Sequence, residues 1–194
     1  MPIQGTLLIG EAMKKLAIIT LAICLGLNSY AQIQTKFWGL EFSSLYKESL
    51  ETLKNSIADR CQYATVEGEA IYATDGRFGG YYWDYVQFGF CKRESGRSLN
   101  EVGFASSHKT YDEARNRYGA LLKALAEKYG TPLKSSGDHR NSDVRWLDVS
   151  KKYGCTLSLV SPEENEAEKS WCVLLIYTDV DRLRQIANAE RDEL

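Results

Sequence analysis

The sequence has few of the residues and motifs on which common enzyme classes depend. It holds only two histidines, His108 and His139, and no H-x-x-x-H spacing, so no histidine metal site is indicated. No G-x-S-x-G nucleophile elbow occurs. The glycines of 76–80 lead into an expected strand, so they offer no helix N-terminus to a phosphate group. We therefore predict no catalytic residue, no metal ligand and no cofactor.

A basic surplus and long hydrophobic runs are also lacking. The chain carries 24 Lys and Arg against 26 Asp and Glu, a formal net charge of −2. Since nothing is left over to neutralise phosphates, we expect no nucleic-acid partner. The apolar run Leu16–Leu27 is shorter than the roughly 17–25 residues that span a bilayer. It therefore predicts no transmembrane anchor once the leader described next is removed.

The N-terminal region has the residue order of a secretory signal. Met13–Lys15 is a short cationic start, and the apolar run Leu16–Leu27 follows it. Ser29 and Ala31 then place small residues at the two positions that signal peptidase reads. This order predicts a cleavable signal peptide over residues 13–31.

The expected cleavage between Ala31 and Gln32 defines the domain organisation. Residues 32–194 would form one secreted domain in the bacterial periplasm or at the cell exterior. Residues 1–12 fit no export signal, and we interpret them as a non-native upstream extension. Lipid attachment at Cys24 is an alternative, disfavoured because a bulky isoleucine precedes that cysteine.

Four cysteines follow the expected cleavage site: Cys61, Cys91, Cys155 and Cys172. An even number in an oxidising compartment predicts two disulfides, with three possible connectivities. Four buried free thiols are the alternative. No C-x-x-C spacing occurs, so neither a zinc site nor a thioredoxin-type redox role is predicted.

One disulfide pairing can be argued against. If 156–160 and 171–177 form a hairpin, Cys172 lies opposite Leu159, four residues from Cys155. Four residues of strand measure about 13 Å, which exceeds the reach of a disulfide. A Cys155–Cys172 bridge is therefore disfavoured.

Hydrophobic periodicity predicts three helices. The clearest is Tyr111–Tyr129, since Thr110 and Glu113 form a capping box at its start and Gly130 ends it. A second is expected over about 44–58, capped by Ser44, with its buried face formed by Tyr46, Leu50, Leu53 and Ile57. A third, after a Thr178 cap, would point Val180, Leu183 and Ile186 inward.

Between the helices the hydrophobic pattern alternates with a period of two. The expected strands are 68–75, 81–91, 100–106, 144–149, 154–160 and 171–178. The order α-βββ-α-βββ-α indicates an α+β fold, with an antiparallel sheet covered by helices on one face. It is also compatible with an internal duplication whose halves are 37–107 and 108–194.

Three segments carry a resemblance to a known module: Phe37–Leu40, Gly76–Gly80 and Tyr118–Pro132. Together they resemble a module of uncharacterised bacterial secreted proteins. Those proteins are similar in layout to the tandem helix-plus-sheet fold of the beta-lactamase inhibitor protein. The resemblance implies a non-enzymatic, protein-binding scaffold.

The aromatic residues of the strand 81–91 suggest a binding surface. By alternation, Tyr81, Trp83 and Tyr85 share one side of the strand, while the other side is apolar as well. Either the strand is central and covered on both faces, or the side with Tyr81, Trp83 and Tyr85 is an open ligand platform that Trp146 extends.

Two function classes follow from these patterns. The first is an exported, non-enzymatic binding or scaffold protein that recognises a protein or a glycan through the aromatic sheet face. The alternative is a small secreted hydrolase, similar to a glycosidase, that uses two of the scattered Asp and Glu side chains. A structural subunit of an envelope assembly is a variant of the first class.

Overall fold

The structure is a computed structural model, and it describes residues 32–57, 60, 62–67, 70–93, 96–137, 141–163 and 170–192. All of them belong to the unit Gln32–Leu194. The expected leader, 13–31, lies outside the described residues, as do Cys61 and His139, so the expectations about them stay predictions. Across the described ranges, no helix is both long and apolar enough to cross a membrane.

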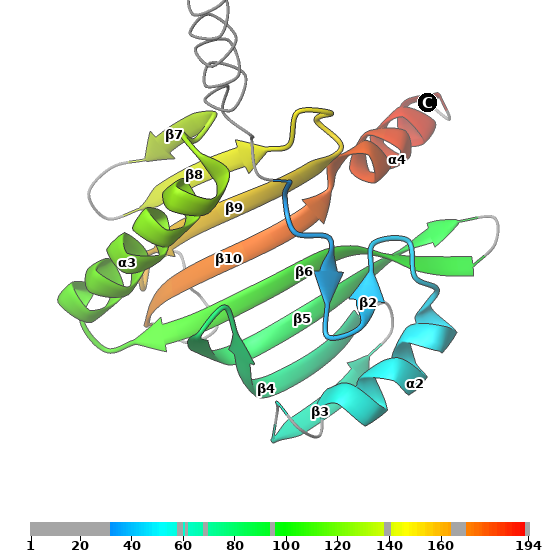
Figure 1. Ribbon diagram of the computed structural model, residues 1–194, viewed down its shortest axis with the longest axis horizontal. Helices are drawn as coiled ribbons and strands as arrows, with labels where there is room; N and C mark the ends of the chain where they lie inside the picture. The colour runs from blue at the N-terminus through cyan, green and yellow to red at the C-terminus, as the bar shows by residue number, and fades with distance from the viewer. Residues whose placement is uncertain are drawn as a thin grey trace, which may run out of the picture. The chain divides into compact units, whose positions relative to one another are not determined.

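The described residues fold as an α+β domain, as predicted (Figure 1). β1 and β2 form a small hairpin, and the other eight strands form one sheet in the order β3-β4-β5-β6-β10-β9-β8-β7. Every pair of neighbouring strands is antiparallel. The elements in chain order are β1 (Lys36–Phe37), β2 (Leu40–Glu41), α2 (Tyr46–Ile57), β3 (Tyr63–Glu67), β4 (Ala70–Phe78), β5 (Tyr81–Arg93), β6 (Gly96–His108), α3 (Tyr111–Tyr129), β7 (Lys134–Gly137), β8 (Ser142–Leu147), β9 (Tyr153–Val160), β10 (Trp171–Asp179) and α4 (Val180–Asp192).

The sheet consists of two four-stranded meanders that meet at their last strands. β3–β6 follow α2, β7–β10 follow α3, and β6 pairs with β10 in the middle of the sheet. The predicted order had three strands in each group, so it missed β3 and β7. Both are short edge strands, and β7 (KSSG) has no apolar alternation by which a strand could be recognised. The internal duplication stays a prediction.

Helix α3 begins and ends where its capping signals predict. The Thr110 hydroxyl accepts a hydrogen bond from the Glu113 N–H at 3.3 Å. At the other end Gly130 takes a φ of 79°, and its N–H donates to the Ala126 carbonyl. Between the caps, Ala114, Tyr118, Leu121, Leu125 and Tyr129 are buried. The apolar stripe of α3 therefore packs against the sheet.

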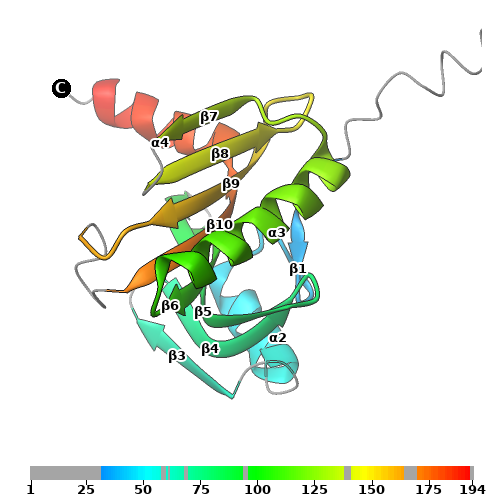
Figure 2. The same ribbon diagram turned by 90° about the vertical axis from the view of Figure 1, so that its left-hand side faces the viewer.

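α2 and α3 cover the same face of the sheet, α2 against β4 and β6 and α3 against β6, β9 and β10 (Figures 1 and 2). Between helices and sheet lies an aromatic core: Phe37, Trp38, Phe78, Trp83, Phe88, Phe104 and Tyr177. Phe78 and Phe104 stack with ring centroids 4.3 Å apart. This core joins the two helices to one face of the sheet. The opposite face, here called the open face, is not covered by α2 or α3.

α4 departs from the prediction that all helices share one face. Its first residue, Val180, lies over Gly154 of β9, where an added Cβ would come within 3.1 Å of the Val180 side chain. Arg182 donates to the Cys91 thiol at 3.3 Å, and Leu183, predicted to point inward, is 43% exposed. α4 therefore borders one end of the open face. Its cap is the carboxylate of Asp179, which accepts from the Arg182 N–H at 3.1 Å, whereas the predicted cap Thr178 belongs to β10.

The turn between β4 and β5 lies further along the chain than the sequence suggested. The expected strand ended at residue 75, but β4 continues to Phe78. Gly79 and Gly80 alone make the two-residue turn, with φ values of 62° and 81°. Two consecutive positive φ values favour glycine at both positions of such a hairpin.

Candidate functional site

The structure does not bring the four predicted platform residues together on one exposed face. Trp83 is 0% exposed and Trp146 is 2% exposed, so both indoles belong to the core. The Trp146 N–H donates to the Gly130 carbonyl at 2.9 Å, at the end of α3. Tyr81 is half-buried, and only Tyr85, 47% exposed, lies on the open face. The predicted patch of Tyr81, Trp83, Tyr85 and Trp146 is therefore corrected.

Tyr81 and Trp83 contact helix α3 through a single arginine. The guanidinium carbon of Arg117 lies 4.3 Å from the ring centre of Tyr81 and 4.8 Å from that of Trp83. The same guanidinium donates to the Tyr82 carbonyl at 2.6 Å. Burial lowers the pKa of Arg117 from its usual value, which is the expected effect of packing a cation between two rings. These aromatic residues hold α3 on the sheet.

A break in the alternation of β5 separates Tyr85 from Trp83. Trp83 and Val86 are both buried although they are three residues apart, and Phe104 contacts the first and pairs with the second. On the neighbouring strand Asp75, which has a φ of 57°, lies at the level of this break. Such an irregularity moves the following side chains to the other face of the sheet. Tyr85 therefore points away from the helices.

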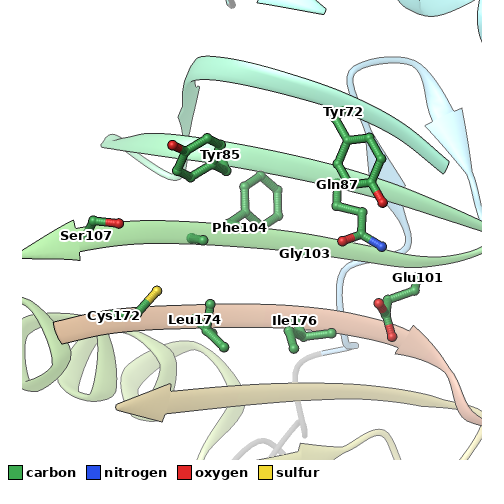
Figure 3. A pocket seen from close by; sticks show the side chains of 11 residues that line it. Tyr72, Tyr85, Gln87, Glu101, Gly103, Phe104, Ser107, Cys172, Leu174 and Ile176 are labelled. Atoms are coloured by element: carbon green, nitrogen blue, oxygen red, sulfur yellow. The ribbon is translucent and has the colours of Figure 1, made fainter. Parts of the chain in front are cut away.

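The open face contains a hollow of about 410 Å³ across the centre of the sheet (Figure 3). Small residues on β6, Gly103 and Ala105, form its floor between larger side chains on the neighbouring strands. Tyr72 and Tyr85 rise on one side, 38% and 47% exposed. The residues that line the hollow are Tyr72, Tyr85, Gln87, Glu101, Gly103, Phe104, Ala105, Ser107, Cys172, Leu174 and Ile176.

Apolar side chains from β10 form the other side of the hollow. Leu174 and Ile176 are only partly buried, and Cys172 extends the same row. Their strand pairs with β6 through Leu174 opposite Ala105 and Ile176 opposite Gly103. The hollow is therefore built from both meanders, with tyrosines from one and aliphatic residues from the other.

One end of the hollow is polar. Figure 3 shows the Tyr72 hydroxyl, the Gln87 amide and the Glu101 carboxylate toward the same end, away from Ser107 and Cys172. Glu101 is the only carboxylate among the described residues that line this hollow. Burial raises the pKa of Glu101 above its usual value, and no charge among the described residues counters the effect.

The backbone around Glu101 is irregular. Gly89 of β5 pairs with Glu101, while Phe90 already pairs with Leu99, so Asn100 is the extra residue of a β-bulge. A Cβ at Gly89 would come within 3.4 Å of the Glu101 Cβ and about 4.0 Å of its carboxylate oxygen. The Glu101 side chain thus lies in van der Waals distance of β5 at Gly89. Bulges commonly re-aim side chains beside functional sites.

A second hollow adjoins this polar end and reaches α4. Tyr72, Gln87 and Glu101 line both hollows, and Leu183 of α4 with Lys92 of β5 closes the second on its far side. The two hollows make the open face concave from β4 to β10 and up to α4. This concave surface is the candidate functional site.

The cysteines form no disulfide among the described residues. Cys91, Cys155 and Cys172 are present as thiols and not as disulfides. Cys172 pairs with Val160, one residue from the predicted Leu159, while Cys155 pairs with Tyr177 five residues away, which keeps the two thiols apart as expected. Burial raises the pKa of Cys155 to about 12, so this thiol is chemically quiet at neutral pH. The predicted pair of disulfides is not present for these three residues.

No described cluster could hold a metal ion, and the one described serine–histidine pair near the sheet lies outside both hollows. No group of three or more His, Cys, Asp or Glu side chains lies close enough within the described ranges to hold a metal ion. The Ser106 hydroxyl and the His108 ring lie 3.1 Å apart, but Ser106 is 4% exposed and lines neither hollow. The glycosidase alternative needs two carboxyl groups facing one cleft, and the open face offers only Glu101 among its described lining residues.

Comparisons with family models, curated proteins and solved structures find no match to this chain. The resemblance to the module of bacterial secreted proteins and to the layout of the beta-lactamase inhibitor protein therefore stays a prediction.

The sequence reasoning missed most of the residues that form the open-face hollow. Tyr72, Gln87, Glu101, Leu174 and Ile176 were not singled out. A usable signal was present in β6, where Gly103, Ala105 and Ser107 alternate with Val102, Phe104 and Ser106. A central strand with only small residues on one side predicts a depression in that face of the sheet.

Proposed function

We propose that this chain is an exported, non-enzymatic binding protein that recognises a partner protein through the open face of its sheet. The observation that carries the proposal is the pair of exposed tyrosines, Tyr72 and Tyr85, beside an apolar hollow on a face that α2 and α3 leave uncovered.

The composition of this face favours recognition over mere solvation. A sheet with one face in water ordinarily places polar residues there. Here the central strands place Tyr72, Tyr85, Leu174 and Ile176 on that face. Tyrosine combines rigid apolar area with a hydroxyl, which is why it is enriched at interface hot spots.

The apolar row on β10 favours a protein over a glycan. Leu174, Ile176 and Cys172 offer no hydrogen-bonding group beyond a thiol to the hydroxyls of a sugar. They match instead the aliphatic side chains of a polypeptide, whose burial stabilises the complex. Recognition of a glycan is the alternative outcome of the experiment below.

The proposal is tested by capture with matched variants. The double variant Tyr72→Ser and Tyr85→Ser should lose its partner in a pull-down from the native envelope extract, because it lacks both aromatic rings of the hollow. Tyr82→Ser removes a tyrosine of similar exposure, 46%, that lines neither described hollow, and it should retain the partner. Equal capture by all three proteins would rule out the open face, and release by a free oligosaccharide would indicate a glycan ligand.

Export is proposed on the leader sequence alone. The N-terminal residue of the protein purified from its own organism should be Gln32, because Ser29 and Ala31 direct cleavage there. N-terminal sequencing checks this directly. A native protein that retains Leu16–Leu27 in a soluble cytosolic fraction would contradict export. The proposal that the open face binds a partner would be unaffected.

A further inference from the structure

Glu101 is a half-buried carboxylate without a partner among the described residues. No hydrogen bond or ion pair of its side chain is formed within them, and burial alone accounts for its raised pKa. Lys92, which lines the adjoining hollow, exerts no resolved electrostatic effect on it. The free protein therefore holds a negative charge in surroundings that disfavour it.

Such a group reduces the stability of the isolated domain. Removing a carboxylate from water costs free energy unless a hydrogen bond or a positive charge compensates for it. The backbone nevertheless places Glu101 on this face, because the bulge at Asn100 shifts the register of β6 against β5 directly beside it. Residues that lower stability without a compensating contact are typical of binding surfaces.

The surroundings of Glu101 match a cationic side chain. The Tyr72 hydroxyl and the Gln87 amide lie toward the same end of the hollow and offer oxygen acceptors (Figure 3). The Tyr72 ring gives apolar area for the methylene groups of a lysine or arginine, whose charged end can also lie over a ring. Immediately beyond, Ile176 and Leu174 accept only apolar groups.

We infer that the open face binds a polypeptide segment that places a lysine or arginine side chain against Glu101 and an apolar side chain against Leu174 and Ile176. This inference rests on the proposed function and names the chemistry of its partner. Charge complementarity selects the cation, and the neighbouring apolar row selects a polypeptide. A free amine such as a polyamine would contact Glu101 but would place no apolar side chain against Leu174 and Ile176.

Two synthetic peptides test the inference. Acetyl-Gly-Leu-Lys-Leu-Gly-amide and its norleucine analogue differ only in the terminal ammonium group of the central side chain. We expect the lysine peptide to bind the purified chain about tenfold more tightly, which is typical of a charge-assisted hydrogen bond that leaves water. NMR titration measures both dissociation constants at neutral pH.

Matched variants assign the effect to one carboxylate. Glu101→Gln keeps the size of the side chain and should bring the two dissociation constants within about twofold of each other. Glu127→Gln makes the same charge change on the exposed side of α3 and should preserve the tenfold preference. An unchanged thermal midpoint, or a higher one, shows that Glu101→Gln is folded.

Three results would overturn the inference: equal binding of the two peptides to the wild-type protein, a lysine preference that survives Glu101→Gln, or no binding of either peptide at millimolar concentration. In each case, partner capture that still depends on Tyr72 and Tyr85 leaves the proposed function standing. The opposite combination is a lysine preference that depends on Glu101 and partner capture that is unchanged in the double tyrosine variant. It would contradict the proposed partner surface and support the cation site.

Discussion

The two faces of the sheet are built from the same strands but differ in what covers them. Under α2 and α3, Trp83, Phe104 and Leu175 are between 0% and 3% exposed. On the open face, neither α2 nor α3 covers the neighbouring residues Tyr85 and Leu174. Residues one or two positions apart in the chain therefore differ in burial, and only the buried set contributes strongly to the stability of the fold.

The largest expected contrast is between Trp83 and Tyr85. Trp83→Ala removes a fully buried indole and should lower the free energy of unfolding by about 3–5 kcal/mol. Tyr85→Ala, at a site 47% exposed, should change it by about 1 kcal/mol or less. Urea denaturation of the two variants measures the difference, and similar losses would mean that the open face is covered in solution.

A closer comparison uses two adjacent leucines of β10. Leu175 lies between Phe104 and Leu157 on the helix side, whereas Leu174 lies between Ala105 and Ser158 on the open face. Leu175→Ala should cost about 2–5 kcal/mol, and Leu174→Ala about 1 kcal/mol. Only Leu174→Ala should weaken partner capture. If Leu174→Ala lowered the free energy of unfolding more than Leu175→Ala, the core would lie on the open face and not on the helix side.

The smallest effect concerns Glu101 and depends on pH. Its folded pKa is raised above the usual value of 4.5, so the folded protein holds this proton more tightly than the unfolded chain does. The free energy of unfolding therefore loses a contribution as pH rises from the unfolded pKa through the folded one. The other ionisable side chains that line the two hollows are Tyr72, Tyr85, Cys91, Lys92 and Cys172.

Glu101→Gln removes that pH-dependent loss. The variant should melt about 2 °C higher than the wild-type protein at neutral pH, and the difference should vanish below about pH 4. Thermal melts between pH 3.5 and 8 check the trend. A variant that is less stable than the wild type at neutral pH would show that Glu101 has a stabilising partner.

Local signals in the sequence predicted the elements better than the faces they present. The caps at Thr110 and Gly130 fix both ends of α3, because each satisfies backbone groups that the helix leaves open. Strict alternation, in contrast, placed Trp83 and Tyr85 on one side of β5. The break between them lies at the level of Asp75 of β4, which has a positive φ, and the alternation within β5 does not reveal it.

The site depends on tertiary arrangement in the same way. Glu101 and Ile176 are distant in the sequence, and they meet only because β6 pairs with β10. The small residues of its floor, Gly103 and Ala105, could be recognised in the sequence of β6, but the neighbouring strands and the position of α4 could not. The exposure of Leu183 illustrates the last point, since its helical spacing predicted an inward side chain.

The junction of β6 and β10 gives the hollow a property that neither meander has alone. Tyr72 and Tyr85, on one side of the hollow, belong to the first meander, and Leu174 and Ile176, on the other side, belong to the second. Neither meander alone would form the hollow. A bound segment would span this seam and tie the halves to each other. A bound ligand would then slow any separation of β6 from β10 in the middle of the sheet.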